Sequence, residues 1–242
     1  MKYTFNSRVR YSETDIHHRL RPDAVLDYFQ DCSTFQSESI GEGMDGLREK
    51  GMVWVVNFWQ IVFDRPLKLM DAITVGTAPV SFKRCIGQRN FWIDDESGQK
   101  AVRCNSIWTL ITLDGLPGKV SEEMLAHYGE DEPLEMDYAN RKIPLPKEPE
   151  AEGYTLTLPE EIPVREYFLD ANLHVNNGWY IKLALALAGA GNAELRELRA
   201  EYKKSALPNE IMYPRVYTRP EDTIVSFCTT DGSVYATVQL FR

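Results

Sequence analysis

The sequence predicts an α+β protein built from two tandem copies of one unit, in which a strand and a helix precede several antiparallel strands. Three observations lead to this fold class. Apolar residues at helical spacing mark one segment in each half of the chain, and segments rich in β-branched and aromatic residues follow both. Arg10 and Asp15 recur as Arg165 and Asp170, each 155 residues later. The same order of elements follows in both halves, which favours a duplication.

The first half begins with a short alternating stretch at Asn6–Tyr11, which predicts a strand. Pro22 is typical of a first helical turn, and the apolar stripe after it predicts an amphipathic helix that ends at Gly41 and Gly43. A turn cluster at residues 94–98 separates two of the later strands. The stripe consists of Val25, Leu26, Phe29, Cys32 and Phe35, and the strands are expected at Val53–Phe63, Ile73–Val80, Ser81–Asp94 and Ala101–Leu113.

A proline-rich, acidic segment without apolar periodicity divides the chain and predicts an extended linker. We therefore expect an N-terminal repeat at residues 1–128, a linker at 129–162 and a C-terminal repeat at 163–242. The segment Trp179–Ala188 is apolar nearly all round and predicts a buried helix, and Asp231-Gly232 predicts a hairpin turn. The second set of strands is expected at Val164–Tyr167, Leu198–Lys204, Met212–Thr218, Thr223–Thr229 and Val234–Phe241.

The composition excludes several classes of protein. The 242 residues include 27 Lys and Arg against 36 Asp and Glu, a net charge of −9, which argues against nucleic-acid binding and attraction to anionic membranes. No apolar run approaches the ~18–20 residues that span a bilayer, and the N-terminus lacks the apolar core of a secretory signal, so we expect a cytoplasmic protein. The four cysteines lack metal-site spacing, and the adjacent His17 and His18 would point to opposite faces of a strand. We expect neither a metal nor a cofactor.

The most informative segment is Asp170–Asn177, just before the buried helix. Asn176 or Asn177 is a suitable N-cap for that helix. The first turn, with Asn177 and Gly178, would then present free backbone N–H groups and the positive end of the helix dipole. Such a helix end can stabilise the oxyanion that forms when a thioester is attacked.

The same segment holds a group that can move a proton. His174 carries an imidazole, a side chain that can act as a general base, and Asp170 and Asn172 could orient it or a water molecule. By spacing alone, the segment is equally well described as a loop with asparagine caps and one hydrogen-bonded histidine. The residues themselves leave both interpretations open.

The pattern Asp-x-Asn-x-His-Val-Asn-Asn, followed by aromatic residues and Ile, resembles the signature of plant and bacterial acyl-acyl-carrier-protein thioesterases. The resemblance covers nearly the whole chain and includes Arg10–Asp15, the helix after Pro22, the aromatic stretch Trp54–Trp59 and Ser106–Trp108. It also includes Arg19, which stands where the second repeat has His174. This resemblance implies two tandem hot-dog repeats, each an antiparallel sheet wrapped around a central helix, with the acyl-chain pocket in the N-terminal repeat and the catalytic residues in the C-terminal one.

The resemblance also implies an activity: hydrolysis of the thioester of fatty acyl-acyl-carrier protein, which releases a free fatty acid. The partner would be acyl carrier protein with its acyl chain. Two alternatives stay open, namely a thioesterase for acyl-coenzyme A and a non-catalytic module that binds acyl thioesters. A single chain supplies both repeats, so a monomer would be complete, while a homodimer through sheet edges is equally compatible with the sequence.

Carried over residue by residue, the resemblance gives Asn172 and His174 as catalytic, with Asp170 as a third polar member. Plant members have a Glu-Cys pair one strand later, and here Lys204-Ser205 or Ser205-Ala206 stands in its place, which excludes a thiolate nucleophile. Three possibilities follow: water attack with Asp170 or His174 as base, which we favour; a water positioned by Ser205; or a role for Glu201.

The substrate contacts implied by the resemblance are less specific. An acyl tunnel is expected between the helix and the sheet of the N-terminal repeat, and its lining residues could equally be ordinary core. Because both partners are acidic, docking of carrier protein would need a local basic patch. The expected lining residues are Phe29, Phe35, Trp54, Val56, Phe58 and Trp92, and the expected patch is Arg196, Arg199, Lys203, Lys204 and Arg215.

Overall fold

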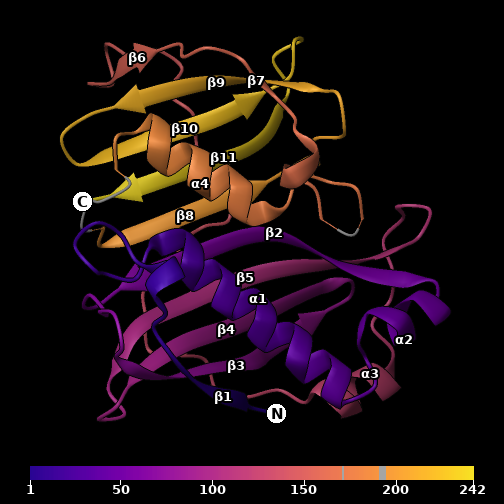
Figure 1. Ribbon diagram of the computed structural model, residues 1–242. Coiled ribbons are helices and arrows are strands. Elements are labelled where there is room, and N and C mark those ends of the chain that lie inside the picture. Colours follow the sequence, from indigo (N-terminus) through magenta and orange to yellow (C-terminus); the bar gives the residue numbers. More distant parts are fainter. Residues whose placement is uncertain (171, 191–194) are drawn as a thin grey trace. The chain divides into compact units, whose positions relative to one another are not determined.

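The computed structural model describes residues 1–170, 172–190 and 195–242. The chain divides into two units, the first with Met1–Leu20 and Ala24–Ala139, the second with Arg21–Asp23 and Asn140–Arg242. Each unit is an antiparallel sheet with a helix across one face (Figure 1). The predicted α+β architecture of two sheet-and-helix repeats is therefore confirmed.

The first unit has five strands in the spatial order β1-β3-β4-β5-β2. The helix α1 crosses one face of this sheet, and the short helices α2 and α3 lie near one end of α1 (Figure 1). A 3₁₀ turn at Tyr11–Glu13 precedes α1. The elements are β1 (Tyr3–Arg8), α1 (Pro22–Ser39), α2 (Met44–Glu49), β2 (Met52–Phe63), β3 (Ala72–Lys83), β4 (Ile86–Asp95), β5 (Lys100–Thr112) and α3 (Glu122–Tyr128).

The second unit repeats this plan with the order β8-β11-β10-β9, and two short strands pair with β9 at the sheet's edge. A 3₁₀ turn at Glu166–Phe168 precedes α4, which packs on β10 and β11. The elements are β6 (Thr155–Thr157), β7 (Ile162–Pro163), α4 (Asn177–Leu187), β8 (Glu197–Tyr202), β9 (Ile211–Thr218), β10 (Asp222–Cys228) and β11 (Val234–Phe241).

Three predicted strands are wrong in detail. The break predicted after Val80 is absent, because a bulge between Pro79 and Ser81 bends β3 without ending it; the turn comes instead at Arg84, whose φ is 58°. The segment Val164–Tyr167 is not a strand, and its second half belongs to a 3₁₀ turn at Glu166–Phe168. That turn brings the Phe168 ring against Trp179 of α4, at 4.5 Å between ring centroids.

The core of the first unit lies between α1 and the sheet. Phe29 of α1 is fully buried, and its ring centroid lies 6.4 Å from that of Trp59 and 5.2 Å from that of Phe91. Because side chains alternate along a strand, Trp59 on β2 and Phe91 on β4 identify the helix-facing positions of their strands. The face of every other residue in this sheet follows from its register with these two.

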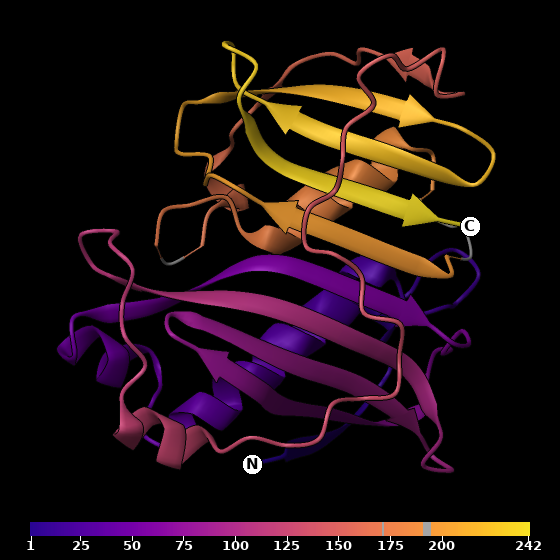
Figure 2. The same ribbon diagram turned by 180° about the vertical axis from the view of Figure 1, so that it is seen from behind.

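The proline-rich segment packs on the sheet faces that point away from the helices (Figure 2). In the first unit, Asn90 Oδ1 accepts hydrogen bonds from the Leu134 N–H and the Tyr138 hydroxyl, both at 2.9 Å. In the second unit, Glu201 Oε2 accepts the Ile143 N–H at 3.1 Å. Buried polar side chains on these outer faces therefore accept hydrogen bonds from backbone N–H groups of the extended segment, which forms few strand-to-strand hydrogen bonds of its own.

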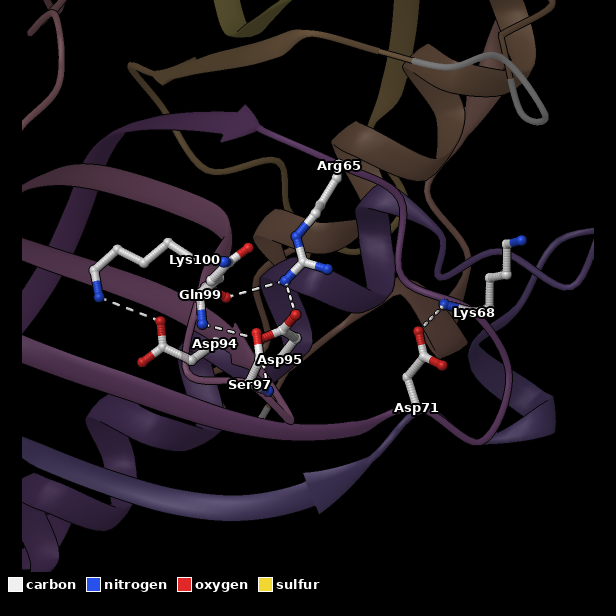
Figure 3. A network of polar contacts seen from close by, with 8 residues as sticks. All are labelled: Arg65, Lys68, Asp71, Asp94, Asp95, Ser97, Gln99 and Lys100. Carbon is white, nitrogen blue, oxygen red and sulfur yellow. Dashed lines mark hydrogen bonds and ion pairs between the residues drawn. The ribbon is translucent and has the colours of Figure 1, made fainter.

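The turn between β4 and β5 is organised by Asp95 (Figure 3). Its Oδ1 accepts the Ser97 hydroxyl at 2.7 Å and the N–H groups of Ser97 and Gln99, each at 2.9 Å, while its Oδ2 pairs with Arg65. Hydrogen bonds from the Ser97 side chain and the Gln99 backbone, together with Arg65, lower the pKa of Asp95 from 3.8 to about 2.

This shift predicts a pH-dependent contribution to stability. The folded pKa is the lower one, so the stabilisation is complete above pH 4 and disappears as the pH falls towards 2. We expect Asp95→Asn to lower the Tm at pH 7, with the difference from the wild type closing near pH 2. Glu96→Gln in the same turn is the control and should change the Tm little. A constant difference across this pH range would contradict the role of the charge.

Candidate active site

The loop before α1 is closed by one carboxylate. Asp15 Oδ1 accepts the N–H groups of His17 at 2.8 Å and Arg19 at 2.9 Å, and the Asp15 N–H donates to the Arg19 carbonyl at 2.8 Å. The chain turns sharply at His18, whose φ is 59°. Burial alone would raise the pKa of Asp15, but hydrogen bonds from Arg19 and His17 outweigh it, and the pKa is lowered.

The loop before α4 has the same construction. Asp170 Oδ1 accepts the N–H groups of Asn172 at 2.8 Å and His174 at 3.3 Å, and the Asp170 N–H donates to the His174 carbonyl at 2.8 Å. The sharp turn here is at Leu173, whose φ is 58°. The first function of Asp170 is therefore to hold the loop that carries the two predicted catalytic residues.

The two loops match at the offset of 155 residues that the sequence indicated. The positive φ angles lie at His18 and Leu173, and the helices begin at Pro22 and Asn177. Isolated β-bridges close both loops, from residue 14 to 20 in the first and from 169 to 175 in the second. The internal repeat is therefore preserved in backbone geometry even where the side chains differ.

The main chemical difference between the loops falls at one position. In the first repeat, Arg19 Nε donates to Asp15 Oδ2 at 2.9 Å, which forms a fixed ion pair. In the second repeat this position holds His174, which is half-buried, and Asn172 beside it is exposed. A guanidinium held in an ion pair is thus replaced by an imidazole, a side chain that can act as a general base.

The start of α4 corrects one prediction. Asn176 is the N-cap, and its side chain accepts the Gly178 N–H at 2.9 Å. That N–H is therefore not available as an oxyanion donor, contrary to the expectation for Gly178. In the described part of the chain the Asn177 N–H has no acceptor, so it is the donor that the helix start leaves open.

Two tyrosines, Tyr180 buried and Tyr202 half-buried, fix this loop to the end of β8. The Tyr180 hydroxyl accepts the Ala206 N–H at 3.1 Å, and the Ala206 carbonyl accepts the Val175 N–H at 3.0 Å. The Tyr202 hydroxyl donates to the Asn177 carbonyl at 3.0 Å. Burial raises the pKa of both tyrosines well above 10, so both stay protonated. This attachment places half-buried Ser205 next to the segment that contacts the loop.

The structure gives Glu201 a different role from catalysis. On β8, Tyr202 faces α4, since its ring lies 5.9 Å from that of Tyr180. The preceding residue, Glu201, must then face the opposite side of the sheet. There its carboxylate accepts the Ile143 N–H and lies 3.6 Å from Lys203 Nζ.

The predicted docking patch is also not assembled beside the loop. Arg199 lies on the same outer face of β8 as Glu201, and its Nε contacts Glu197 at 2.6 Å. Arg215 is the register partner of Ser226, next to the helix-facing Phe227, so it faces outward too. Arg196 donates to the carbonyl of Arg242, Lys203 is held by Glu201, and Lys204 lies over the Tyr235 ring and 4.0 Å from Glu210.

The predicted acyl-lining residues divide between the two sheet faces. Phe29 is fully buried under the sheet, and Val56 and Trp54 pair with the helix-facing Trp108 and Leu110. Two other predictions, Trp92 and Phe58, are wrong. Trp92 is next to Phe91 and packs on Gly76, and Phe58 is next to Trp59, so alternation places both on the far face. Phe35 is 43% exposed and its ring lies 5.4 Å from that of Phe5 on β1, so its place in the lining stays a prediction.

One group of side chains in the described residues has the composition of a metal site. Glu42, Glu123 and His127 bring their ligand atoms within 4.8 Å of one another. Lys50 Nζ, however, lies 2.6 Å from Glu42 Oε1, and His127 Nδ1 lies 2.8 Å from the same oxygen. The lysine ammonium therefore already neutralises the buried carboxylate, and we assign no metal to this group.

Sequence reasoning missed Tyr180 and Tyr202. A signal for Tyr180 was present, because it is the one hydroxyl-bearing residue on an otherwise apolar helix, and a buried hydroxyl must find a partner. Nothing comparable indicates Tyr202, whose contact depends on how β8 lies against α4.

The fold and the paired loops define a tandem hot-dog protein whose second loop carries His174 at the position where the first carries Arg19. The model of the acyl-ACP thioesterase N-terminal domain matches residues 1–128, more than half of the chain. The chain therefore belongs to the acyl-ACP thioesterase family. Among the described residues, no helix has both the length and the apolar character needed to cross a membrane.

Individual relatives agree with this assignment. An acyl-[acyl-carrier-protein] hydrolase of Cuphea viscosissima is 25% identical over 206 residues, covering 80% of this chain and 48% of the relative. A palmitoyl-acyl carrier protein thioesterase of Arabidopsis thaliana is 25% identical over 215 residues, covering 82% and 51%. The chain thus spans about half the length of these curated relatives.

Solved structures show the same fold at low sequence identity. An acyl-ACP thioesterase from Bacteroides thetaiotaomicron has a TM-score of 0.88 at 19% identity, covering 99% of this chain and 97% of that one. A 12:0-ACP thioesterase from Umbellularia californica has a TM-score of 0.82 at 16% identity, covering 99% and 96%.

The loop geometry predicts matched effects on stability. Asp15→Ala and Asp170→Ala each remove the acceptor of two backbone N–H groups, so we expect each to lower the free energy of unfolding by about 1–3 kcal/mol. Asp170→Asn keeps an acceptor oxygen and should lower it less. Urea denaturation measures all three variants. An unchanged stability in Asp170→Ala would contradict the structural role of this carboxylate.

Proposed function

We propose that this protein hydrolyses the thioester of fatty acyl-acyl-carrier protein and releases the free fatty acid. The observation that carries the proposal is the replacement of Arg19 by His174 within two loops that otherwise share their backbone hydrogen bonds. Membership of the acyl-ACP thioesterase family supports the same reaction class.

In the proposed mechanism, His174 is the general base. The Asp15–Arg19 pair shows that a side chain at this position can reach the second carboxylate oxygen of the loop aspartate. In the described part of the chain the His174 ring forms no such contact with Asp170. We therefore propose that Asp170 holds the loop backbone and that a ring nitrogen of His174 accepts the proton. Exposed Asn172 would position the water, and Ser205, which precedes the Ala206 that contacts Val175, is the second candidate for this role.

The proposed reaction transfers one proton from water to His174 and then from His174 to the leaving thiolate. His174 takes a proton from water as the oxygen attacks the thioester carbon, and the Asn177 N–H at the start of α4 stabilises the oxyanion that forms. The intermediate then collapses with cleavage of the carbon–sulfur bond. The imidazolium returns its proton to the departing thiolate, which leaves as the free thiol.

The residues around the loop do not distinguish between acyl carrier protein and coenzyme A as the carrier of the acyl chain. The basic residues expected to bind acidic carrier protein do not form one patch beside the loop, so acyl-coenzyme A stays a second candidate substrate. The ratio of kcat/KM on the two carriers with the same acyl chain decides between them. A higher value on coenzyme A would overturn the carrier-protein proposal but not the hydrolysis.

The histidine assignment has a matched control in the first repeat. We expect His174→Ala to lower kcat by about 10²–10⁴, the range of a lost general base, while Arg19→Ala, its equivalent, changes kcat little per folded molecule. Glu201→Gln should likewise keep its kcat. Single-turnover hydrolysis of a purified acyl-carrier substrate measures each variant. Full turnover in His174→Ala would overturn the assignment of this residue as the base, whereas absence of turnover in the wild type would leave a non-catalytic acyl-thioester binding module as the better description.

A further inference from the structure

A row of polar side chains crosses the helix-facing side of the first sheet. Trp59 on β2 is the register partner of Ser106 on β5, and Ser106 is the partner of Arg89 on β4. All three are buried, in a core that otherwise contains mainly aromatic and aliphatic groups such as Phe29 and Phe91. Strands lie about 4.8 Å apart, so the row extends roughly 10 Å across the sheet.

Arg89 is the unusual member of this row. Its Nη1 donates to Gln36 Oε1 and, at 3.2 Å, to Thr77 Oγ1, and its guanidinium lies 5.6 Å from the Tyr128 ring centroid. Among the described residues it forms no ion pair with a carboxylate. Burial lowers its pKa to about 10, so it remains charged at neutral pH. Buried cations are normally paired with an anion, and this one is held by neutral groups.

Trp59 provides a second, independent observation. Its ring is fully buried, and its indole N–H has no acceptor in the part of the chain that the structure describes. The neighbouring Trp108 shows the ordinary case, since its Nε1–H donates to Ser106 Oγ at 2.7 Å. A buried donor without a partner destabilises the fold, so its presence indicates a role other than packing.

At the level of this row, the inward-facing side chains of α1 include a polar one. The inner residues of this helix are apolar through Phe29 and Cys32. In the next turn Phe35 contacts Phe5 on the edge strand β1, while Gln36 meets Arg89. An aliphatic chain lying along the helix from the apolar side would therefore meet hydrocarbon first and the guanidinium afterwards.

We infer that Arg89, with Trp59, forms the polar end of the acyl site and determines the length of acyl chain that the protein accepts. This inference rests on the proposed function, because it takes an acyl chain as the guest. Each methylene buried against apolar side chains tightens binding about fourfold. A methyl end that reaches the guanidinium gains nothing comparable and must displace its polar contacts, whereas a terminal hydroxyl can accept from the same donors.

The test uses binding alone. Acyl-pantetheine analogues with an amide in place of the thioester cannot be hydrolysed, and isothermal titration with saturated chains of increasing length gives their Kd values. For the wild type we expect about fourfold tighter binding per methylene up to a limiting length, and at least tenfold weaker binding beyond it. Arg89→Met should extend the limit by two or more methylenes, while Arg89→Lys should keep it.

The controls address folding and location. Arg103→Met removes an arginine from the opposite face, where its Nε pairs with Asp64 at 2.8 Å, and should leave the limit unchanged. Arg89→Gln removes the charge but keeps hydrogen bonding, and replaces Arg89→Met if that variant does not fold. At the limiting length, a terminal hydroxyl should favour binding to the wild type and disfavour binding to the variant without the charge.

The same limit in the wild type and in the charge-free variant would overturn the inference, as would the absence of binding by any analogue. Failure of hydrolysis is a separate result. A protein that binds the analogues with an Arg89-dependent limit but turns over no thioester would keep this inference and lose the proposed catalysis.

Discussion

The hydrogen bonds from an aspartate carboxylate to the N–H groups of its own loop are the constraint on which both repeats depend. Asp15 and Asp170 each bind the backbone two and four residues ahead, which forces one residue between them into a left-handed conformation. The helix can then begin at a fixed distance after the aspartate. Because the helix covers the sheet, the position of this one carboxylate determines which side chains reach the interior and which remain at the loop.

The two faces of each sheet have different tasks. The inner face packs a helix, and the outer face satisfies the backbone of the proline-rich segment through buried polar groups such as Asn90 and Glu201. This division explains why several polar residues that look catalytic in the sequence are structural. It also explains why basic residues on β8 and β9 lie away from the histidine loop.

Much of the fold followed from local patterns, whereas the site followed only in part. Pro22, the turn at Asp231-Gly232 and the 155-residue offset report directly on backbone geometry, so they led to correct elements. The faces of Phe58 and Trp92 did not follow, because a bulge in β2 and the register of β4 determine them. The Asn176 cap likewise uses an N–H that the sequence suggested was free, since either asparagine fitted the cap position.

The Asp15–Arg19 pair has a consequence for how a duplicated protein divides its work. A dimer of identical single repeats would carry the same side chain at this position in both loops, so any titratable group would appear twice. In a fused chain the two positions can differ. The first repeat has the guanidinium of Arg19, which stays charged at physiological pH, and the second repeat has the imidazole of His174. Asymmetry, rather than size, is what tandem fusion adds to this architecture.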